Sequence, residues 1–507
     1  MSAQDFNLYA HFQKQFVAHP DKELLCTATN KSYRYADIDR ESARLANFLS
    51  GIGVDPGGRV SVQLQKSPEA LCLYLACLRG GFVFQPLNPA LHSGELEYFL
   101  GNAEPAVVVC DPTREATIRP LAAAAGVKHL LTLDADGQGS LIAQSQSTAE
   151  DFCAVPSGKD DLAALLYSSG TTGVPKGIML THGNLLSNAQ ALVKVWGFTE
   201  DDRLLHALPI FHVHGLFVAI GCVLLSGANM RWLPAYDTGQ VLKFLPECTV
   251  MMGVPTYYTR LLATAHLTAD ACKNIRVFIS GSAPLLEETF VDFESRTGHR
   301  ILERYGMTET NMNTSNPLNG IRKPGTVGPP LPGVEARITN DNGDLLPTNE
   351  IGNLQVRGPN VFVGYWKMPD KTAEDFTEDG FFDTGDQGRI DEDGYISIVG
   401  RARDMVITGG LNVYPKEVEL FIDGLPGVKE SAVIGVPHPD FGEAVVAVVV
   451  LDDGAKPGED DLLLAAKEHL ANYKVPKRVV FLDELPRNSM AKVQKQILRE
   501  TYQNLFS

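Results

Sequence analysis

Hydroxyl, glycine and lysine side chains are concentrated in one short stretch of the chain, residues 167–177, with the sequence Tyr-Ser-Ser-Gly-Thr-Thr-Gly-Val-Pro-Lys-Gly. An apolar run, residues 162–166, precedes it, so we expect a strand that opens into a polar loop. Glycines let backbone N–H groups approach an anion closely, hydroxyls donate hydrogen bonds, and Lys176 adds a positive charge. The stretch therefore predicts a phosphate-binding loop, and the alternative is an ordinary polar surface loop.

The spacing differs from that of a Walker loop. Only two residues separate Gly170 from Gly173, and Lys176 is followed by Gly177. A Walker loop has four residues between its glycines and ends in Gly-Lys-Ser/Thr. The sequence thus indicates a different class of phosphate-binding protein.

Further motifs follow in order at residues 280–285, 303–309, 365–366, 384–386, 400–401 and 486–492. Together with the loop they resemble the motifs of the adenylate-forming enzymes, which include acyl-CoA synthetases, peptide-synthetase adenylation domains and firefly luciferase. The segments 210–215, 304–305 and 311–317 are similar to malonyl-CoA synthetases. The resemblance extends from about Phe6 to the C-terminus. It implies that ATP, with Mg²⁺, activates a carboxylic acid, which is then transferred to coenzyme A.

The resemblance also implies a role for each matching residue. Thr308 contacts the α-phosphate, Glu309 holds Mg²⁺, and Lys492 bridges the substrate carboxylate and the α-phosphate, so these three form the catalytic group. Asp386 accepts the ribose hydroxyls. The implied ATP-binding residues are Ser168, Ser169, Gly170, Thr171, Thr172, Gly173, Lys176, Ser282, Ala283, Pro284, Glu303, Tyr305, Gly306, Met307, Thr308, Asp386 and Arg401. Without the resemblance, Lys492 is a solvated charge and Thr308–Glu309 a surface pair.

For the second half reaction, the resemblance implies that a C-terminal unit rotates about Arg403 and presents Gly409 and Gly410 to the pantetheine arm of coenzyme A. Glycines let a backbone strand pass close to a narrow tunnel, although a Gly-Gly pair is also a common hairpin turn. Two positions depart from the family pattern, because Ala491 replaces the usual glycine before Lys492 and Arg403 replaces the usual Asp or Lys. The context of Lys492 also resembles that of a lysine controlled by an acetyltransferase and a deacetylase.

The residue type at position 304 bears on which acid the protein activates. Relatives that accept aryl or fatty acids commonly carry a small residue there, whereas a buried guanidinium facing an apolar chain costs several kcal/mol. A second carboxylate removes that cost, so we hypothesise malonate, or methylmalonate, with Arg304, Ser282, Arg260 and His212 as its binding residues. The alternatives are a salt bridge of Arg304 with Glu303 or another acid, and a solvated position for Arg260.

Three histidines lie close together at positions 206, 212 and 214. We reject a metal site because no carboxylate or cysteine completes a set and because Gly215 suggests a turn. His212 or His214 is expected to line the acyl pocket. His206 is expected to be a half-buried, hydrogen-bonded residue.

The bulk composition bounds the remaining possibilities. A chain of 507 residues predicts two or three domains, and its net charge of −17 argues against nucleic acid or an anionic membrane as partner. Small anionic substrates then require a local cationic pocket. The eight cysteines show no C-x-x-C pair, which favours core positions in a reducing compartment. No basic apolar leader and no apolar run of about 18 residues is present, so we expect a cytoplasmic protein.

The elements that must position these residues alternate between strand and helix. Helices are expected at 36–50, 68–79 and 181–188, and residues 253–262 are expected to turn from a strand into a helix. Strands are expected at 59–64, 81–86, 105–110, 203–209 and 301–306, and residues 277–284 are expected to be a buried strand that ends in a glycine loop. Residues 134–158 are expected to be a connection. Short strands at 334–338, 352–357 and 394–399 predict a small β subdomain, and residues 401–404 a linker. Beyond it, helices at 415–423 and 460–470 and strands at 428–436, 444–451 and 479–482 are expected.

The predicted fold class is α/β. Residues 1–402 form a large N-terminal domain of layered α/β subdomains with a small β subdomain, and residues 403–507 form a mobile α+β C-terminal domain with its hinge near Arg403. Three alternatives to a malonyl-CoA synthetase remain open. They are a synthetase for another short acid, an adenylation module that loads a carrier protein, and a catalytically silent homologue used as a scaffold.

Overall fold

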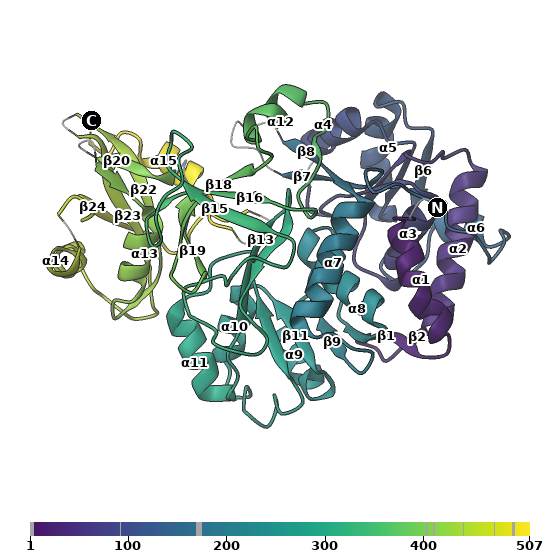
Figure 1. The fold of residues 1–507 in the computed structure, drawn as a ribbon, viewed down its shortest axis with the longest axis horizontal. Coiled ribbons are helices and arrows are strands. Elements are labelled where there is room, and N and C mark those ends of the chain that lie inside the picture. The colour runs from purple at the N-terminus through teal and green to yellow at the C-terminus, as the bar shows by residue number, and fades with distance from the viewer. Residues whose placement is uncertain are drawn as a thin grey trace.

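The structure of the protein is a computed structural model that describes residues 5–91, 93–168, 175–401, 404–408, 411–439, 441–470, 472–488 and 492–506. Within these residues the strands form four sheets of eight, seven, four and five strands. Two large sheets with their helices make up the N-terminal part, and the five-stranded sheet lies at the opposite end of the molecule (Figure 1). The predicted α/β class, with a large N-terminal part and a smaller C-terminal part, is confirmed.

The seven-stranded sheet carries the phosphate-loop stretch. Its order is β17-β8-β7-β4-β3-β5-β6, in which β7, β4, β3, β5 and β6 are parallel and β8 and β17 antiparallel. Helices connect the parallel strands because such strands need a long crossover. The strands are β3 Arg59–Gln63, β4 Val83–Pro86, β5 Val107–Cys110, β6 His129–Thr132, β7 Leu162–Ser168, β8 Lys176–Thr181 and β17 Gly364–Tyr365.

The eight-stranded sheet has the order β14-β13-β12-β11-β9-β10-β1-β2, with parallel strands from β13 to β1. The carboxyl ends of its parallel strands share one edge, which is where α/β proteins place ligands. The strands are β1 Glu23–Thr27, β2 Ser32–Arg34, β9 Arg203–His206, β10 Asn229–Trp232, β11 Val250–Gly253, β12 Val277–Ser280, β13 Leu302–Met307 and β14 Asn311–Ser315.

The helices of the N-terminal part begin and end at residues suited to those positions. For example, the Ser67 hydroxyl accepts a hydrogen bond from the Ala70 N–H at 3.1 Å at the start of α3, and Gly81 ends this helix with φ 68°. The helices are α1 Leu8–Ala18, α2 Tyr35–Gly51, α3 Pro68–Gly80, α4 Ser93–Ala103, α5 Glu115–Ala124, α6 Ser140–Ser145, α7 His182–Trp196, α8 Ile220–Ser226, α9 Thr238–Phe244, α10 Pro255–Leu262, α11 Glu287–Thr297 and α12 Pro369–Asp375, with short turns η1 Pro112–Arg114, η3 Leu245–Glu247 and the π-helix η2 His214–Ala219.

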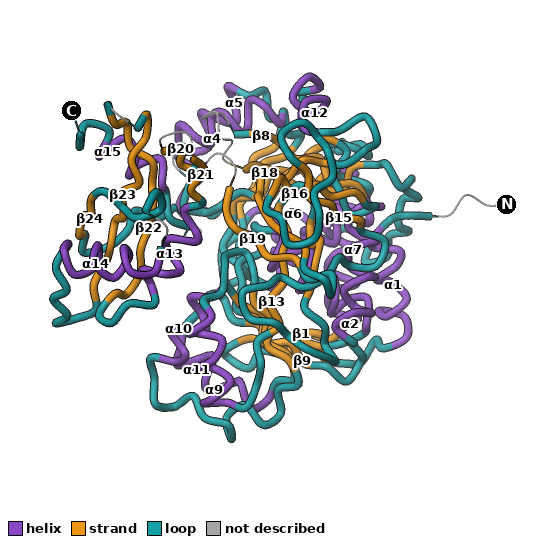
Figure 2. Tube along the Cα trace, turned by 60° about the vertical axis from the view of Figure 1, so that its left-hand side comes forward, coloured by secondary structure: helices purple, strands orange, loops and turns teal. Residues whose placement is uncertain are grey.

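The four-stranded sheet is antiparallel, in the order β15-β16-β18-β19. It contains β15 Glu335–Thr339, β16 Gly352–Arg357, β18 Phe382–Ile390 and β19 Ile396–Arg401. The five-stranded sheet contains β20 Val406–Thr408, β21 Leu411–Val413, β22 Val428–His438, β23 Gly442–Leu451 and β24 Arg478–Phe481, with helices α13 Pro415–Asp423, α14 Glu459–His469 and α15 Lys495–Tyr502. Figure 2 shows these C-terminal elements grouped apart from the two large sheets.

Three local expectations differ from the structure. Residues 134–158 contain the short helix α6, and the β subdomain has a fourth strand, β18. Gly215 lies inside the π-helix η2 and not in a turn, and it packs directly on the Pro209 carbonyl, where a Cβ would not fit. No described helix is long and apolar enough to cross a membrane.

Candidate active site

Lys176 of the phosphate-loop stretch lies at the start of β8 and is 8% exposed. Its Nζ is 3.8 Å from the Asp375 carboxylate and 4.6 Å from the centre of the Tyr365 ring. A buried ammonium is thus held at the loop end of the β7–β8 hairpin. Residues 169–174, which include the predicted ligands Ser169, Gly170, Thr171, Thr172 and Gly173, lie outside the described residues, as does the Ser168 side chain.

Three predicted nucleotide residues come together across the β subdomain. Asp386 on β18 is paired in register with Arg401 on β19, and its Oδ1 is 2.7 Å from the Arg401 Nε. The Tyr305 hydroxyl, from β13, donates to Asp386 Oδ2 at 2.5 Å. Asp386 is therefore a fixed, buried acceptor between a cation and a phenol, which suits hydrogen bonds from a diol.

Thr308 and Glu309 lie in the turn between β13 and β14. Burial raises the pKa of the Glu309 carboxyl, although the nearby charges of Arg401 and Lys176 oppose this. No described cation forms an ion pair with this carboxylate, and hard carboxylate oxygens are the ligands that Mg²⁺ prefers alongside phosphates. The donor set therefore fits Mg²⁺.

Arg304 is the most unusual side chain of the site. It is 2% exposed, and its three guanidinium nitrogens have no hydrogen-bond partner among the described residues. Its guanidinium lies directly on Gly281, where an added Cβ would be 2.5 Å from Arg304 Cζ. Burial lowers the pKa of Arg304 to about 9, which leaves it charged at neutral pH. The alternative, a salt bridge with Glu303, is not seen among the described residues, although the charge of Glu303 opposes the lowering of the Arg304 pKa.

Two histidines and a serine line the space beside Arg304, and we call Arg304, His212, His214 and Ser282 the acyl cluster. The Nε2 atoms of both histidines are buried without a described partner, and Ser282 Oγ is 3.3 Å from His214 Nδ1. Ser282 has a φ of 71°, a conformation that a serine adopts only when its surroundings enforce it. Burial, with a contribution from Arg304, holds the pKa of His214 well below its usual value.

The C-terminal unit reaches this cluster. Burial, with a smaller contribution from the positive charge of Lys492, lowers the pKa of the His212 imidazole to about 3. The charge of Lys492, which is exposed, is thus felt at the His212 imidazole. Its turn is closed by hydrogen bonds between the Asn488 N–H and the Lys492 carbonyl at 2.9 Å and between the Lys492 N–H and Asn488 Oδ1 at 3.0 Å.

Other predicted residues are not part of this assembly. Arg260 is exposed on α10, with its guanidinium 5.8 Å from the centre of the Tyr236 ring, so it lies outside the buried cluster. Ala283 and Pro284 are exposed in the loop after β12, and Gly306 and Met307 end β13. Arg403, Gly409 and Gly410 lie outside the described residues, as does Ala491.

Two residues of the site were not predicted from the sequence. Asp375 holds Lys176, and Gly281 supports the Arg304 guanidinium. No local signal marks Asp375, because it lies far from the loop in sequence. Gly281 does follow a buried strand, and a glycine at such a position indicates that another group approaches the backbone closely.

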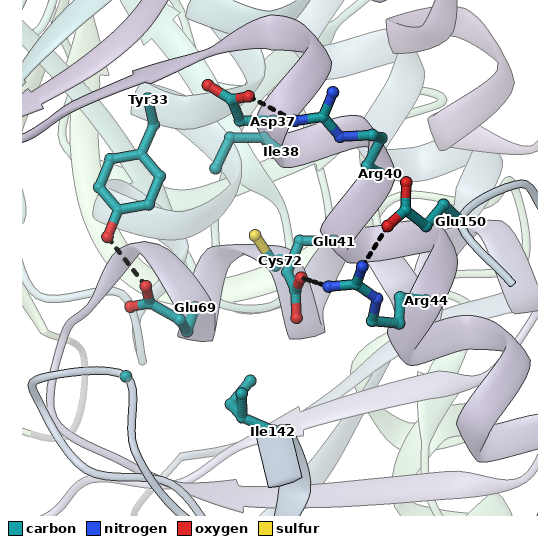
Figure 3. A pocket seen from close by; sticks show the side chains of 11 residues that line it. Tyr33, Asp37, Ile38, Arg40, Glu41, Arg44, Glu69, Cys72, Ile142 and Glu150 are labelled. Carbon is teal, nitrogen blue, oxygen red and sulfur yellow. Dashed lines mark hydrogen bonds and ion pairs between the residues drawn. The ribbon is translucent and has the colours of Figure 1, made fainter. Parts of the chain in front are cut away.

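A separate cleft of about 410 Å³ lies between α2 and α3 (Figure 3). Its charged side chains pair with one another: Arg40 with Asp37 at 2.7 Å, and Arg44 with Glu41 at 2.9 Å. None of the predicted site residues lines it. The cleft is therefore not the candidate active site.

Replacing Arg304 by methionine is expected to leave the folded protein as stable or to stabilise it by about 1–4 kcal/mol, because a buried charge without a partner opposes folding. Arg79, equally buried, donates at 2.8 Å to each of the Asp39 carbonyl, Ser42 Oγ and the Phe152 carbonyl. The matched variant Arg79→Met should lose about 3–5 kcal/mol. Urea unfolding of both variants checks this pair. Equal losses would mean that Arg304 has a structural partner.

Glu303 makes stability depend on pH. Burial raises the pKa of this carboxyl from 4.5 to about 7. The protonated carboxyl therefore contributes fully to the free energy of unfolding below about pH 4.5, and this contribution is lost as pH rises through 7. Glu303→Gln keeps an oxygen for the Leu285 N–H, which donates to Glu303 Oε1 at 3.0 Å. Relative to the native protein, the variant should gain about 3 kcal/mol between about pH 5 and pH 8. Urea unfolding at both pH values measures the gain, and a constant difference contradicts the assignment.

Comparison with known proteins agrees with this geometry. Residues 12–366 match the AMP-binding enzyme family, and residues 417–492 match the AMP-binding enzyme C-terminal domain. The chain belongs to the AMP-binding enzyme family. It is 34% identical to a malonate–CoA ligase of Arabidopsis thaliana, over 99% of this chain and 90% of that protein.

Solved structures are also similar. ATP-bound MatB from Rhodopseudomonas palustris is 52% identical, with a TM-score of 0.97 over 99% of this chain and 100% of that one. The apo form of the same protein gives a TM-score of 0.86 over the same shares of the two chains, at 52% identity. The arrangement of this chain is therefore more similar to the ATP-bound form than to the apo form.

Proposed function

We propose that the protein is an AMP-forming acid–CoA ligase that joins malonate to coenzyme A with ATP, and that also accepts methylmalonate. The observation that supports malonate most strongly is the buried Arg304 guanidinium with no described hydrogen-bond partner. A monocarboxylate would leave this charge unpaired, whereas the second carboxylate of malonate neutralises it and accepts its hydrogen bonds.

In the first half reaction, an oxygen of the free carboxylate of malonate attacks the α-phosphorus of ATP, and pyrophosphate leaves. Two anions must approach each other, so the barrier falls when fixed cations hold both. We assign this role to Lys492, with Lys176 on the departing phosphates and Thr308 on the α-phosphate. Mg²⁺, held by Glu309 and the phosphates, supplies charge neutralisation when bound.

The nucleotide is held by the remaining residues of the site. Asp386 and Arg401 bind the ribose, and adenine lies between Tyr305 and the loop Ser282–Ala283–Pro284. The second carboxylate lies against Arg304, His212 and Ser282. We also retain Arg260, on α10, as a cation at the mouth of the acyl pocket.

In the second half reaction, the thiolate of coenzyme A attacks the acyl carbon of malonyl-adenylate, and AMP leaves as the thioester forms. We propose residues 1–402 and 403–507 as the two domains. Rotation near Arg403 withdraws Lys492 and brings Gly409 and Gly410 to the pantetheine arm. The eight free cysteines fit the reducing cytoplasm, where we place the reaction.

We also propose that a lysine acetyltransferase acts on Lys492. The residue is exposed and its positive charge is the feature that adenylation uses. Acetylation removes this charge and would stop the first half reaction.

Pyrophosphate release from malonate and ATP, measured with and without coenzyme A, tests the proposed function. Multiple turnovers that depend on coenzyme A are expected. Turnover that instead requires an added carrier protein would favour a carrier-loading module, and no release with any carboxylic acid would favour a silent homologue.

A further inference from the structure

A lysine without a carboxylate partner is buried between the two large sheets. Lys66 follows β3 and is 7% exposed. Its Nζ is 2.7 Å from His206 Nδ1, 2.8 Å from the His206 carbonyl oxygen, and 4.3 Å from the centre of the Trp232 ring. Two hydrogen bonds and the face of the Trp232 ring thus surround the Lys66 amino group, and burial lowers its pKa well below the usual value. Within the described part of the chain, Lys66 forms no ion pair with an acid.

His206 links Lys66 to the π-helix η2 through its two ring nitrogens. Because Lys66 donates to Nδ1, the hydrogen of the neutral imidazole is on Nε2, which then donates to the Gly215 carbonyl at 2.9 Å. His206 is 1% exposed at the end of β9, so the expectation of a half-buried residue was wrong in degree. The result is one chain of hydrogen bonds from the seven-stranded sheet, through the eight-stranded sheet, to η2.

The π-helix needs such support. π-Helical turns are rare and concentrate at functional sites. Here the turn packs so closely that a Cβ on Gly215 would be 2.0 Å from the Pro209 carbonyl oxygen. His214, the first residue of η2, contacts Ser282 Oγ through Nδ1 and leaves a buried Nε2 beside Arg304. The orientation of this turn therefore sets the histidine face of the acyl cluster.

We propose that Lys66 and His206 are positioning residues for acid selection. They fix the first turn of η2, and so the imidazole of His214, in the place where the second carboxylate of the substrate is bound. The hydrogen bonds that carry this positioning run from Lys66 Nζ to His206 Nδ1 and from His206 Nε2 to the Gly215 carbonyl. This inference rests on the proposed function, because it concerns which acid the same pocket accepts.

Two variants test the pair. Lys66→Met keeps an unbranched side chain on Trp232 but removes the donors. His206→Phe keeps a ring beside Trp232, whose centre is 5.0 Å away, but removes both hydrogen bonds. We expect each to raise KM for malonate about tenfold to a hundredfold, to leave KM for ATP within about twofold, and to lower the preference for malonate over butyrate.

Val62→Ala is the matched control. Val62 is 5% exposed on β3, so the change loosens the same strand without touching the pair. It should lower the melting temperature and leave both KM values unchanged. An unchanged malonate KM in either variant, or a rise in KM for ATP equal to that for malonate, overturns the inference. An inactive native protein with malonate in the same assay would instead refute the proposed function.

Discussion

Replacing Arg304 by methionine is expected to lower kcat/KM for malonate by about 10²- to 10⁴-fold, since removing one partner of a buried ion pair costs about 3–5 kcal/mol. The loss should appear mainly in KM for malonate, because the guanidinium contacts the part of the acid that does not react. Activity with butyrate should rise relative to malonate, because methionine leaves an apolar end wall. Steady-state pyrophosphate release with both acids measures the two effects.

The control for this prediction is Arg276→Met. Arg276 also lies in the eight-stranded part of the fold, where its Nε is 2.7 Å from Asp202 Oδ1, away from the acyl cluster. It should lower stability without changing the choice of acid. If Arg304→Met keeps the native preference for malonate, the guanidinium does not bind the second carboxylate.

Replacing Lys492 by methionine is expected to lower the rate of malonyl-adenylate formation by about 10³-fold, the cost of removing one preorganised charge from a charged transition state. The positive charge of Lys492 contributes to the lowered pKa of His212, a member of the acyl cluster. Thioester formation should be affected far less, because the proposed rotation withdraws Lys492 before that step. Malonate-dependent exchange of labelled pyrophosphate into ATP measures the first half reaction by itself.

Lys495 is a matched control three residues along the chain. Its Nζ is 2.5 Å from the carboxylate of Glu419, which is itself buried and accepts a hydrogen bond from the Val433 N–H at 2.8 Å. Lys495→Met should therefore destabilise the C-terminal part and leave the exchange rate at its native value once the protein is folded. Equal exchange rates in the two variants would remove Lys492 from the catalytic group.

Some features of the proposed acid-binding pocket could be predicted from the sequence, and others could not. Arg304 was identified from its position before Tyr-Gly-Met-Thr-Glu, and burial of an arginine beside a ligand pocket followed from that position. That Arg304 packs against Gly281 with no hydrogen-bond partner among the residues the structure describes is shown only by the folded chain. The left-handed φ of Ser282 and the π-helical turn at His214 are also products of tertiary contacts and have no sequence signature of their own.

The fold was predicted better than its long-range contacts. The spacing of apolar residues located α2 and α13, because each buries one face, whereas α3 was located as an apolar run and is buried on nearly all sides. By contrast, Lys66 and His206 are 140 residues apart in sequence, so no local pattern joins them. The same reason explains why Asp375 was not predicted as the partner of Lys176.

The distribution of charge agrees with the proposed chemistry. The chain carries a net charge of −17, yet Lys176, Arg304 and Lys66 are each at most 8% exposed. Burying a charged group is costly, so the buried positions of Lys176 and Arg304 support the roles proposed for them, Lys176 on the phosphates and Arg304 on the second carboxylate.

The central claim is that the acyl pocket selects an acid with a negative charge at both ends. Its most direct test is kcat/KM of the native protein for malonate, acetate and butyrate, measured as pyrophosphate release at saturating ATP and coenzyme A. We predict that malonate exceeds both monocarboxylates by at least about 10²-fold, the lower bound set by one buried charge pair. Equal values for the three acids would contradict the claim.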